Sequence, residues 1–291
     1  MRHVLTLIAD RAATSLSPAL IARVREAVEG EAPILLAPGE AADIPCAAPP
    51  DPARIAAALE GAPVDAIATR PRGRRKGLLV ADMDSTIVTS ETLDELAALA
   101  GAGAAVAAIT RRSMNGEIEF AEALRERVAM LRGLKLDALE RIWSGVRFTP
   151  GARELVATMR AHNATTALVT GGFTFFSGRV AAALGFDVHR ANTLLDDGAQ
   201  LTGTVREPIL DRDAKLATLR ELAEARGLRL AATLAVGDGA NDLGMLQEAG
   251  LGIAFRATPV VAAAARARVD HANLRALLFA QGYRAAEFSE G

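Results

Sequence analysis

The sequence predicts an α/β fold built on a doubly wound parallel sheet. Four short apolar runs lack polar alternation, which is typical of parallel strands buried on both faces: "LLVAD", "TTALVT", "AATLAVGD" and "LGIAF". Helical patterns such as "PGARELVATMRAHN" and "RDAKLATLRELAEARG" lie between these runs, and this alternation indicates a sheet with helices on both faces. Carboxylates, hydroxyls and glycines follow directly after three of the runs, which is where open α/β sheets bind ligands.

The bulk composition is that of an ordinary globular protein with one large or two smaller domains, since 51% of its 291 residues are hydrophobic and 23% are charged. The formal net charge of −2 provides no global field for nucleic acid or an anionic membrane, so we expect neither as a partner. The single cysteine, Cys46, excludes an intramolecular disulfide. The N-terminus lacks a signal-peptide pattern, and the longest uncharged apolar stretch, residues 97–109, is too short to span a bilayer. We therefore expect a cytoplasmic protein.

Residues 1–70 are predicted to form a small α/β domain at the N-terminus. Its strand and helix patterns alternate along the chain, with strands at 3–9, 32–39 and 64–70 and helices at 17–30 and 51–61. The basic segment "RPRGRRKG" follows, and we assign residues 71–77 to a linker. A nucleic-acid patch is the alternative for this segment, but the nearly balanced charge of the chain favours a solvated linker.

The main domain is predicted to consist of residues 78–90 and 147–291, interrupted by a helical insertion. Between 91 and 146 no parallel-strand pattern occurs, and helical patterns such as "EFAEALRERVAML" and "LDALERIW" fill the segment. An insertion at this point, directly after the first core strand, is expected to lie over the edge of the sheet as a cap.

Two aspartates, Asp82 and Asp84, end the first core strand. Their i, i+2 spacing directs both side chains the same way if the extended backbone persists. Adjacent carboxylates resist ionisation unless a cation lies between them, and Mg²⁺ is commonly held by one or two carboxylates together with substrate phosphate. A polar turn capped by Ser85 and Thr86 is the alternative, but it does not explain two aspartates after an apolar strand.

Three further segments place polar groups at successive strand ends. In "LVTGGF", Thr170 supplies a hydroxyl, and Gly171 and Gly172 offer unobstructed backbone N–H groups to an anion at an expected helix start, although a simple turn is the commoner meaning of such a motif. Lys215 lies near the start of a helix, where the helix dipole disfavours a cation, and this placement suggests that it faces an anion. In "VGDGANDLGML", Asp238, Asn241 and Asp242 supply oxygen atoms, with a turn and helix cap as the alternative.

These four motifs, in this order, resemble those of the haloacid dehalogenase-like phosphatases. "DMDST" is similar to the first motif of that family, "VTGG" to the second, Lys215 to the third and "GDGAND" to the fourth. The resemblance covers roughly residues 77–273. "DMDSTIVTSETLDELA" and "MNGEIEFAEALRERVAML" are similar to the members that hydrolyse O-phosphoserine. The resemblance implies a three-layered core with a helical cap, and residues 1–70 loosely resemble the ACT-like domains of some relatives.

The resemblance also implies a role for each matching residue in the reaction. Asp82 would be the nucleophile that becomes an aspartyl-phosphate, and Asp84 would be the general acid and base. Mg²⁺ would be held by Asp82, the backbone carbonyl of Asp84 and Asp238, with Asp242 supporting the metal from behind. The activity would be Mg²⁺-dependent conversion of O-phospho-L-serine to L-serine, the last step of serine biosynthesis.

The substrate-binding residues follow from the same resemblance. Four of them would bind the phosphate: Thr170, Gly171, Lys215 and Asn241. Position 170 is Thr where the phosphoserine-hydrolysing members usually have Ser, so the hydroxyl is kept and a methyl group is added. Glu91 would receive the substrate ammonium and Arg127 its carboxylate, because the planar fork of arginine suits a carboxylate.

Other functions remain open from the sequence. A phosphatase or phosphotransferase of the same family could act on another phosphorylated amino acid, and a non-catalytic amino-acid sensor could retain the fold. A response-regulator receiver also uses an aspartate at a strand end, but the helical insertion and the second aspartate, Asp84, disfavour it. The expected partner is a small molecule, and a homodimer is compatible with the sequence.

Overall fold

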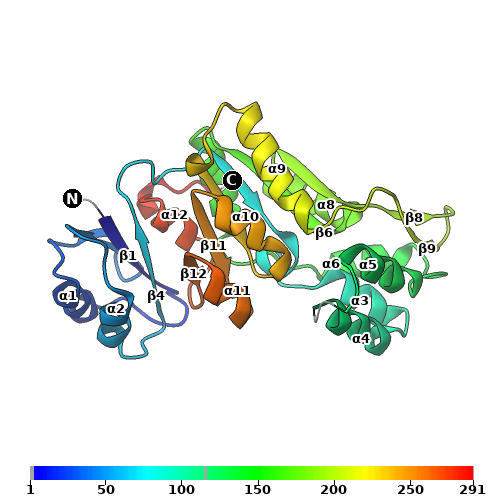
Figure 1. Cartoon of the computed structure of the whole chain (residues 1–291), viewed down its shortest axis with the longest axis horizontal. Coiled ribbons are helices and arrows are strands. Elements are labelled where there is room, and N and C mark those ends of the chain that lie inside the picture. The colour runs from blue at the N-terminus through cyan, green and yellow to red at the C-terminus, as the bar shows by residue number, and fades with distance from the viewer. Residues whose placement is uncertain (1–2, 115–116, 291) are drawn as a thin grey trace.

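The computed structural model describes residues 3–114 and 117–290, so the part of the expected cap motif at 115–116 lies outside the described residues. Its centre is a six-stranded sheet, of which β6, β11 and β12 are labelled in Figure 1. All its strands are parallel, in the order β12-β11-β10-β5-β6-β7. The strands are β5 (Leu78–Ala81), β6 (Thr165–Phe173), β7 (Val188–Asn192), β10 (Thr233–Gly237), β11 (Leu251–Phe255) and β12 (Ala267–Val269). The prediction of a parallel sheet is confirmed. The edge strands β7 and β12 were not expected, because "VHRAN" is polar and "ARV" is only three residues long.

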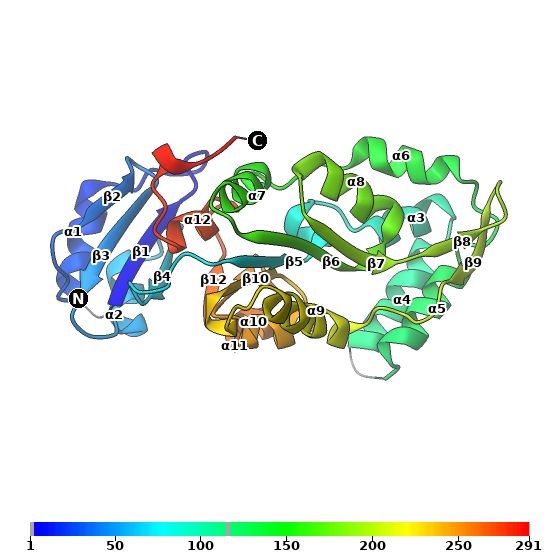
Figure 2. The same cartoon turned by 90° about the horizontal axis from the view of Figure 1, so that it is seen from above.

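Helices cover both faces of this sheet, which gives the core three layers (Figure 2). One face carries α7 (Ala152–Ala161) and α8 (Thr174–Leu184), and the other carries α9 (Arg212–Ala225), α10 (Leu243–Glu248) and α11 (Pro259–Ala264). Successive residues of β5 point to opposite faces: Leu79 belongs to the buried cluster under α7 and α8, whereas Leu78 and Val80 belong to the cluster under α9 and α10. Burial on both sides explains why the strand sequence is continuously apolar.

The segment between β5 and α7 forms a helical cap, as predicted. It contains α3 (Thr92–Leu99), α4 (Gly103–Met114), α5 (Phe120–Ala129) and α6 (Asp137–Gly145). A hairpin of β8 (Leu194–Asp196) and β9 (Leu201–Val205), which was not expected, extends from the core and packs beside α5 (Figure 2). Two backbone hydrogen bonds join the hairpin to the cap, from Gly133 N to Leu201 O at 2.9 Å and from Leu201 N to Leu134 O at 2.8 Å.

The N-terminal residues form a separate four-stranded antiparallel sheet in the order β2-β3-β1-β4. Its elements are β1 (His3–Ala9), α1 (Pro18–Ala27), β2 (Ile34–Ala37), β3 (Ala41–Cys46), α2 (Pro52–Leu59) and β4 (Val64–Thr69). This βαββαβ order is the ferredoxin-like arrangement. Strand β3 was not expected, because Asp43 and Pro45 interrupt its apolar pattern. The burial of Asp43 is compensated by Thr6, whose hydroxyl donates to Oδ1 at 2.7 Å.

The basic linker is only partly solvated: Arg72, Gly73 and Arg75 are exposed, but the side chain of Arg74 is largely buried between the N-terminal sheet and the residues Phe279 and Ala280. Its guanidinium donates to both carboxylate oxygens of Asp43, at 2.6 and 3.1 Å, and to Thr6 Oγ1 at 2.9 Å. It also donates to the backbone carbonyls of Ala280 and Phe279, which belong to the core. Arginine side chains tolerate burial when their donors are paired in this way.

Two further contacts join the N-terminal sheet to the core. Asp65 on β4 accepts hydrogen bonds from the backbone N–H groups of residues 270–272, which follow β12. Arg275 donates to Glu40 at 2.7 and 3.1 Å. Between these polar contacts, α12 (Ala276–Ala280) packs on the sheet, and Ile8 and Ile67 share one buried cluster with the core.

Arg74→Ala is expected to destabilise the protein by about 3–5 kcal/mol, because it leaves the carboxylate of Asp43 buried without its cation. Denaturant unfolding monitored by circular dichroism measures this change. The matched control is Arg54→Ala: Arg54 pairs with Glu29 at 2.8 Å, but both side chains are largely exposed. We expect this control to unfold at nearly the wild-type denaturant concentration, and an equal cost for both variants would contradict the buried role of Arg74.

No helix in the described part of the chain is both long enough and apolar enough to cross a membrane.

Candidate active site

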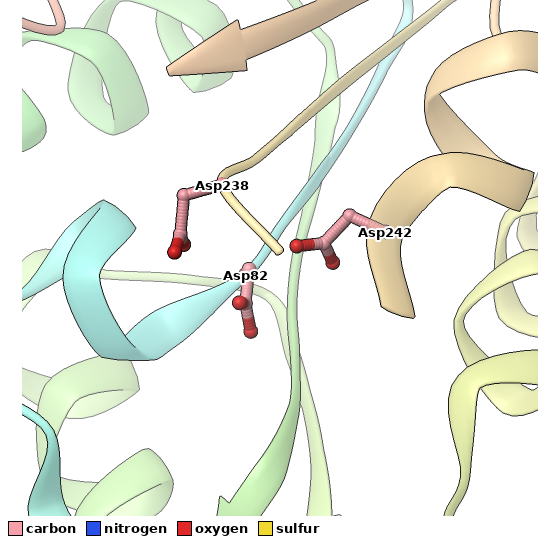
Figure 3. Close-up of side chains that lie close together, drawn as sticks. All are labelled: Asp82, Asp238 and Asp242. Atoms are coloured by element: carbon pink, nitrogen blue, oxygen red, sulfur yellow. The ribbon is translucent and has the colours of Figure 1, made fainter. Parts of the chain in front are cut away.

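Three adjacent strands deliver the polar groups of the site to one edge of the parallel sheet. Asp82 follows β5, Asp238 follows β10 and Thr170 lies near the end of β6, and these strands are neighbours in the order β10-β5-β6. The short helical turn after β10 adds Asp242. The three aspartates each present a carboxylate oxygen within 4.8 Å of the others (Figure 3). The convergence expected from the sequence is therefore present at the carboxyl edge of the sheet.

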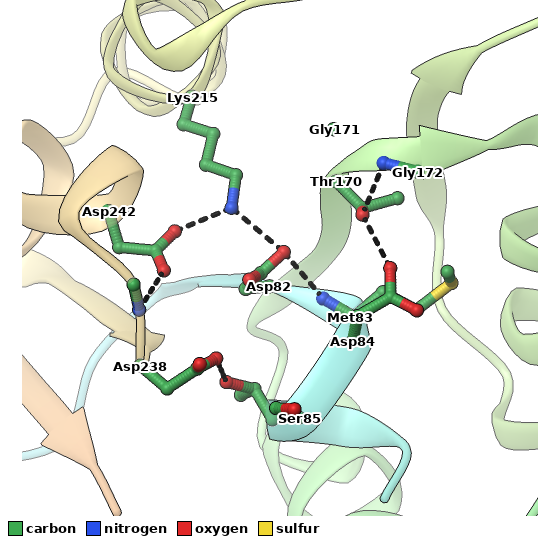
Figure 4. A network of polar contacts seen from close by, with 12 residues as sticks. Asp82, Met83, Asp84, Ser85, Thr170, Gly171, Gly172, Lys215, Asp238 and Asp242 are labelled. Atoms are coloured by element: carbon green, nitrogen blue, oxygen red, sulfur yellow. Dashed lines mark hydrogen bonds and ion pairs between the residues drawn. The ribbon is translucent and has the colours of Figure 1, made fainter. Parts of the chain in front are cut away.

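Lys215 enters this group from the first turn of α9. Its side chain is 1% exposed, and Nζ lies 2.8 Å from Asp82 Oδ1 and 2.6 Å from Asp242 Oδ1 (Figure 4). Burial alone lowers the pKa of a lysine, but the two carboxylates outweigh burial and hold the pKa of Lys215 well above its ordinary value. The unfavourable position of this cation at a helix start thus has its explanation, since the side chain faces anions as predicted.

The negative charges in this group outnumber the positive one, because the three aspartates lie beside one ammonium, that of Lys215. Burial and the neighbouring Asp242 raise the pKa of Asp82, against the opposing effect of Lys215. Burial also raises the pKa of Asp238 to about 6, although the hydroxyl of Thr86 partly offsets it. A divalent cation would relieve this repulsion, and carboxylate oxygens are the ligands that hard divalent cations prefer. The residues present therefore fit a divalent metal.

The expectation that Asp82 and Asp84 point the same way, with a cation between their carboxylates, is wrong, because the extended backbone ends at Asp82 and a helical turn begins at Met83. Asp84 points away from the cluster, toward the cap and β6 (Figure 4). Its Oδ1 accepts from Thr92 N at 3.0 Å, and its Oδ2 accepts from the hydroxyl of Thr170 at 3.3 Å. Burial raises the pKa of Asp84, so this carboxyl can carry a proton more readily than an exposed aspartate. Asp82 and Asp84 thus have different environments: Asp82 is buried and paired with an ammonium, and Asp84 is half-buried against neutral hydrogen-bond donors.

The glycines of the second motif allow close approach around Asp84. A Cβ atom at Gly172 would lie 2.8 Å from Asp84 Oδ2, so a side chain there would displace this carboxylate. The backbone N–H of Gly172 donates to Thr170 Oγ1 at 2.9 Å. Strand β6 continues through Phe173, and α8 begins only at Thr174. The expectation that Gly171 and Gly172 lie at the start of a helix is therefore wrong. Gly171 faces the cap, since a Cβ atom at this position would lie 3.1 Å from the ring of Phe120.

Two hydroxyls of the first motif, those of Ser85 and Thr86, make contacts that the sequence did not predict. From the sequence they were expected only as possible caps of a turn. Thr86 is fully buried and donates from Oγ1 to Asp238 Oδ1 at 2.8 Å. Ser85 donates from Oγ to Glu91 Oε1 at 2.6 Å. The adjacency of these hydroxyls to the aspartate pair was visible in "DMDST", but their partners are distant in the sequence or reached only by a turn.

The cap brings Glu91 and Arg127 to the same region without direct contact. Arg127 on α5 is partly buried and donates from Nε to the carbonyl of Ala123 at 3.2 Å. Its Nη1 also donates to Thr110 Oγ1 at 3.5 Å, but both protein partners are neutral. Arg127 has no ion pair with any described residue. Burial lowers the pKa of Arg127, and the nearby carboxylates of Asp94 and Glu91 partly oppose that effect. A partly buried guanidinium without a carboxylate partner among the described residues is suited to bind an anion that comes from outside the chain. Asn241 lies half-buried beside Asp242, in the turn Ala240–Asp242.

Known proteins resemble this chain in sequence and in fold. The family model of haloacid dehalogenase-like hydrolases matches residues 79–247. The chain is 44% identical to a probable phosphoserine phosphatase of Schizosaccharomyces pombe, over 72% of this chain and 70% of that protein. It is also 44% identical to a phosphoserine phosphatase of Archaeoglobus fulgidus, over 69% of this chain but only 58% of the archaeal protein. A solved structure of a probable phosphoserine phosphatase from Vibrio cholerae, in its unliganded form, superposes with a TM-score of 0.81 at 30% identity, covering 98% of this chain and 88% of that one.

Proposed function

The chain belongs to the haloacid dehalogenase-like hydrolases, and from this premise we propose that it hydrolyses O-phospho-L-serine to L-serine and phosphate, which places it at the last step of serine biosynthesis. The observation that carries the proposal is the meeting of Asp82 with Lys215 and Asp238 beside a second acid, Asp84, which is half-buried and has a raised pKa. Phosphate monoesters hydrolyse extremely slowly in water, so an enzyme must neutralise the phosphoryl group and align the attack on it.

Asp82 attacks phosphorus in this proposal, and an aspartyl-phosphate forms as the bond from phosphorus to the serine oxygen breaks. The ion pair with Lys215 favours the ionised form of Asp82 that this attack requires. Asp84 protonates the departing serine oxygen, a role that suits its raised pKa, and then takes a proton from the water that cleaves the intermediate. One carboxylate thus serves as nucleophile and the other as acid and base.

The phosphoryl oxygens are held by the hydroxyl of Thr170, the backbone of Gly171, Lys215 and Asn241. Mg²⁺ would be held by Asp82, the backbone carbonyl of Asp84 and Asp238, and it would offset negative charge on the carboxylates and the phosphoryl group. Asp242 supports this arrangement through two contacts: it accepts from Lys215 Nζ at 2.6 Å and from the N–H of Gly239 at 3.0 Å.

The cap supplies the groups that recognise the amino acid. Glu91 receives the substrate ammonium, and Arg127, which has no carboxylate partner among the described residues, receives the substrate carboxylate. We further assign residues 1–70 to an ACT-like domain, 71–77 to the linker, 78–90 with 147–291 to the core and 91–146 to the cap. A homodimer remains compatible with this organisation.

A substrate panel tests the proposed function. We expect phosphate release from O-phosphoserine to exceed release from phosphothreonine and from sugar phosphates, and to stop when EDTA removes the metal. Arg127→Ala should raise KM for O-phosphoserine by roughly ten- to a hundredfold, because a charged carboxylate contact is lost. Arg125 on the same helix pairs with the exposed Glu207, so Arg125→Ala is the matched control with unchanged kinetics. Preference for sugar phosphates together with an unchanged KM in Arg127→Ala would refute the zwitterion pocket, and transfer of phosphate to an added alcohol would indicate a phosphotransferase.

The pH dependence of KM is expected to report on Glu91. This residue remains accessible to solvent at the rim of the site, yet partial burial of the carboxylate, with Asp84 and Asp238 nearby, raises the pKa of Glu91 to about 7. Because only the ionised carboxylate attracts an ammonium, affinity should fall as pH drops through this pKa, and KM should rise about five- to tenfold from pH 8 to pH 6. Steady-state kinetics of Glu91→Gln provide the control: the variant should have a high KM at both pH values. A wild-type slope that persists in the variant would assign the titration to another group.

A further inference from the structure

The loop between β5 and α3 closes on itself beside the active site. Ser85 N donates to the carbonyl of Ser90 at 3.2 Å, and Ser85 Oγ donates to Glu91 Oε1 at 2.6 Å. One residue further on each side, Thr92 N donates to Asp84 Oδ1 at 3.0 Å. Successive residues that follow the nucleophile are therefore bonded to the successive residues that open the cap.

The backbone of Ser85 is held in an uncommon conformation at this crossing. Its φ of 54° lies in the left-handed region, which residues other than glycine rarely adopt. The rest of the loop is fixed by neighbouring backbone: Val88 N donates to Met83 O at 2.9 Å, and Thr89 N donates to Arg147 O at 3.0 Å. Conformations of this kind cost free energy and persist where the surroundings impose them, often at functional sites.

Glu91 has little else to orient its side chain. It occupies the position before α3 but makes no capping hydrogen bond to that helix. Within the described part of the chain, Ser85 is the hydrogen-bond partner of its carboxylate, and no lysine or arginine pairs with it at 4.0 Å or less. A long, partly exposed glutamate without a fixed partner would lose rotamer freedom when it binds an ammonium, and this loss lowers affinity.

We propose that Ser85 is a positioning residue, whose hydroxyl holds Oε1 of Glu91 so that the other oxygen faces the substrate ammonium. The inference rests on the proposed function and extends it: selectivity for an amino group depends on a residue that does not touch the substrate. Ser85 is next to Asp84, so the same turn sets both the acid and the ammonium-binding carboxylate.

The test compares two substrates that differ only in the amino group, O-phosphoserine and 3-phosphooxypropionate. Ser85→Ala should raise KM for O-phosphoserine about tenfold, the effect of losing a hydrogen bond to a charged group, while kcat changes by less than about twofold. For 3-phosphooxypropionate, kcat/KM should stay at the wild-type value. Equal losses for both substrates, or a loss confined to kcat, would overturn the inference.

Two further variants separate the hydroxyl from the backbone. Ser85→Gly removes the hydroxyl but adopts a positive φ without strain, so it should show the same rise in KM as Ser85→Ala; recovery of the wild-type KM would assign the effect to the backbone and refute the inference. In a Glu91→Gln background, adding Ser85→Ala should change KM no further, and a full additional loss would also refute it. Failure of the proposed function is visible separately, because the wild-type protein would then not hydrolyse O-phosphoserine.

Discussion

Lys215→Met is expected to lower the free energy of unfolding by about 3–5 kcal/mol in metal-free buffer, because it leaves two buried carboxylates without their shared ammonium. In the wild type, Nζ lies 2.8 Å from Asp82 and 2.6 Å from Asp242, and the lysine side chain is 1% exposed. In a separate assay with Mg²⁺, phosphatase activity should fall by at least about 10²–10³-fold, since a preorganised cation at the reacting phosphoryl group is lost. Denaturant titration and phosphate release measure the two effects.

The free energy of unfolding of Lys215→Met should change with pH in a direction that the buried carboxylates determine. Burial and carboxylate repulsion already raise the pKa of Asp82 and of Asp238, and removal of the ammonium raises both further. The native state then binds more protons than the unfolded state at pH values between the ordinary aspartate pKa and the raised ones, so stability should increase as pH falls through that window. The matched control is Lys135→Met on the exposed surface of the cap, with stability and activity near wild type. A Lys215→Met variant as stable as this control would contradict the buried ion pairs.

Asp82→Asn is expected to reduce kcat by at least about 10⁴-fold, because an amide cannot replace the carboxylate nucleophile. The variant should remain folded, since Asp242 still pairs with Lys215. Circular dichroism measures the folding of the variant, and phosphate release from O-phosphoserine measures its activity. The matched control is Asp137→Asn, which makes the same substitution at an exposed position at the start of α6. Mg²⁺-dependent activity that persists in Asp82→Asn would contradict the mechanism.

The apolar strands of the core were predictable because burial on both faces leaves a direct mark on composition. β5 and β10 consist of residues that any sheet of this kind requires, and their ends identified Asp82 and Asp238. The cap was predictable for the complementary reason, since helical periodicity continued where a strand was due. The N-terminal strand β3 was not predictable: Asp43 and Pro45 suggest a loop until Arg74, 31 residues away, is known to reach Asp43.

The residues of the site also differ in how far the sequence alone reveals their contacts. Lys215 carried a local signal, a cation at the wrong end of a helix, and the structure explains it. Ser85 and Thr86 carried no signal beyond their neighbourhood, because the contact of Thr86 with Asp238 spans 152 residues and that of Ser85 depends on a positive φ. The burial of Arg74 was likewise hidden, since a basic segment with glycine and proline has the composition of a solvated linker.

The central claim is that Asp82 forms a covalent phosphoryl intermediate. Brief reaction with O-phosphoserine and Mg²⁺, followed by reduction with borohydride and mass spectrometry of the peptides, tests it directly, because borohydride reduces an acyl phosphate to an alcohol. We predict homoserine at position 82 only in samples that received substrate. Reduction at another carboxylate, or an unmodified Asp82 in enzyme quenched during steady turnover, would contradict the account.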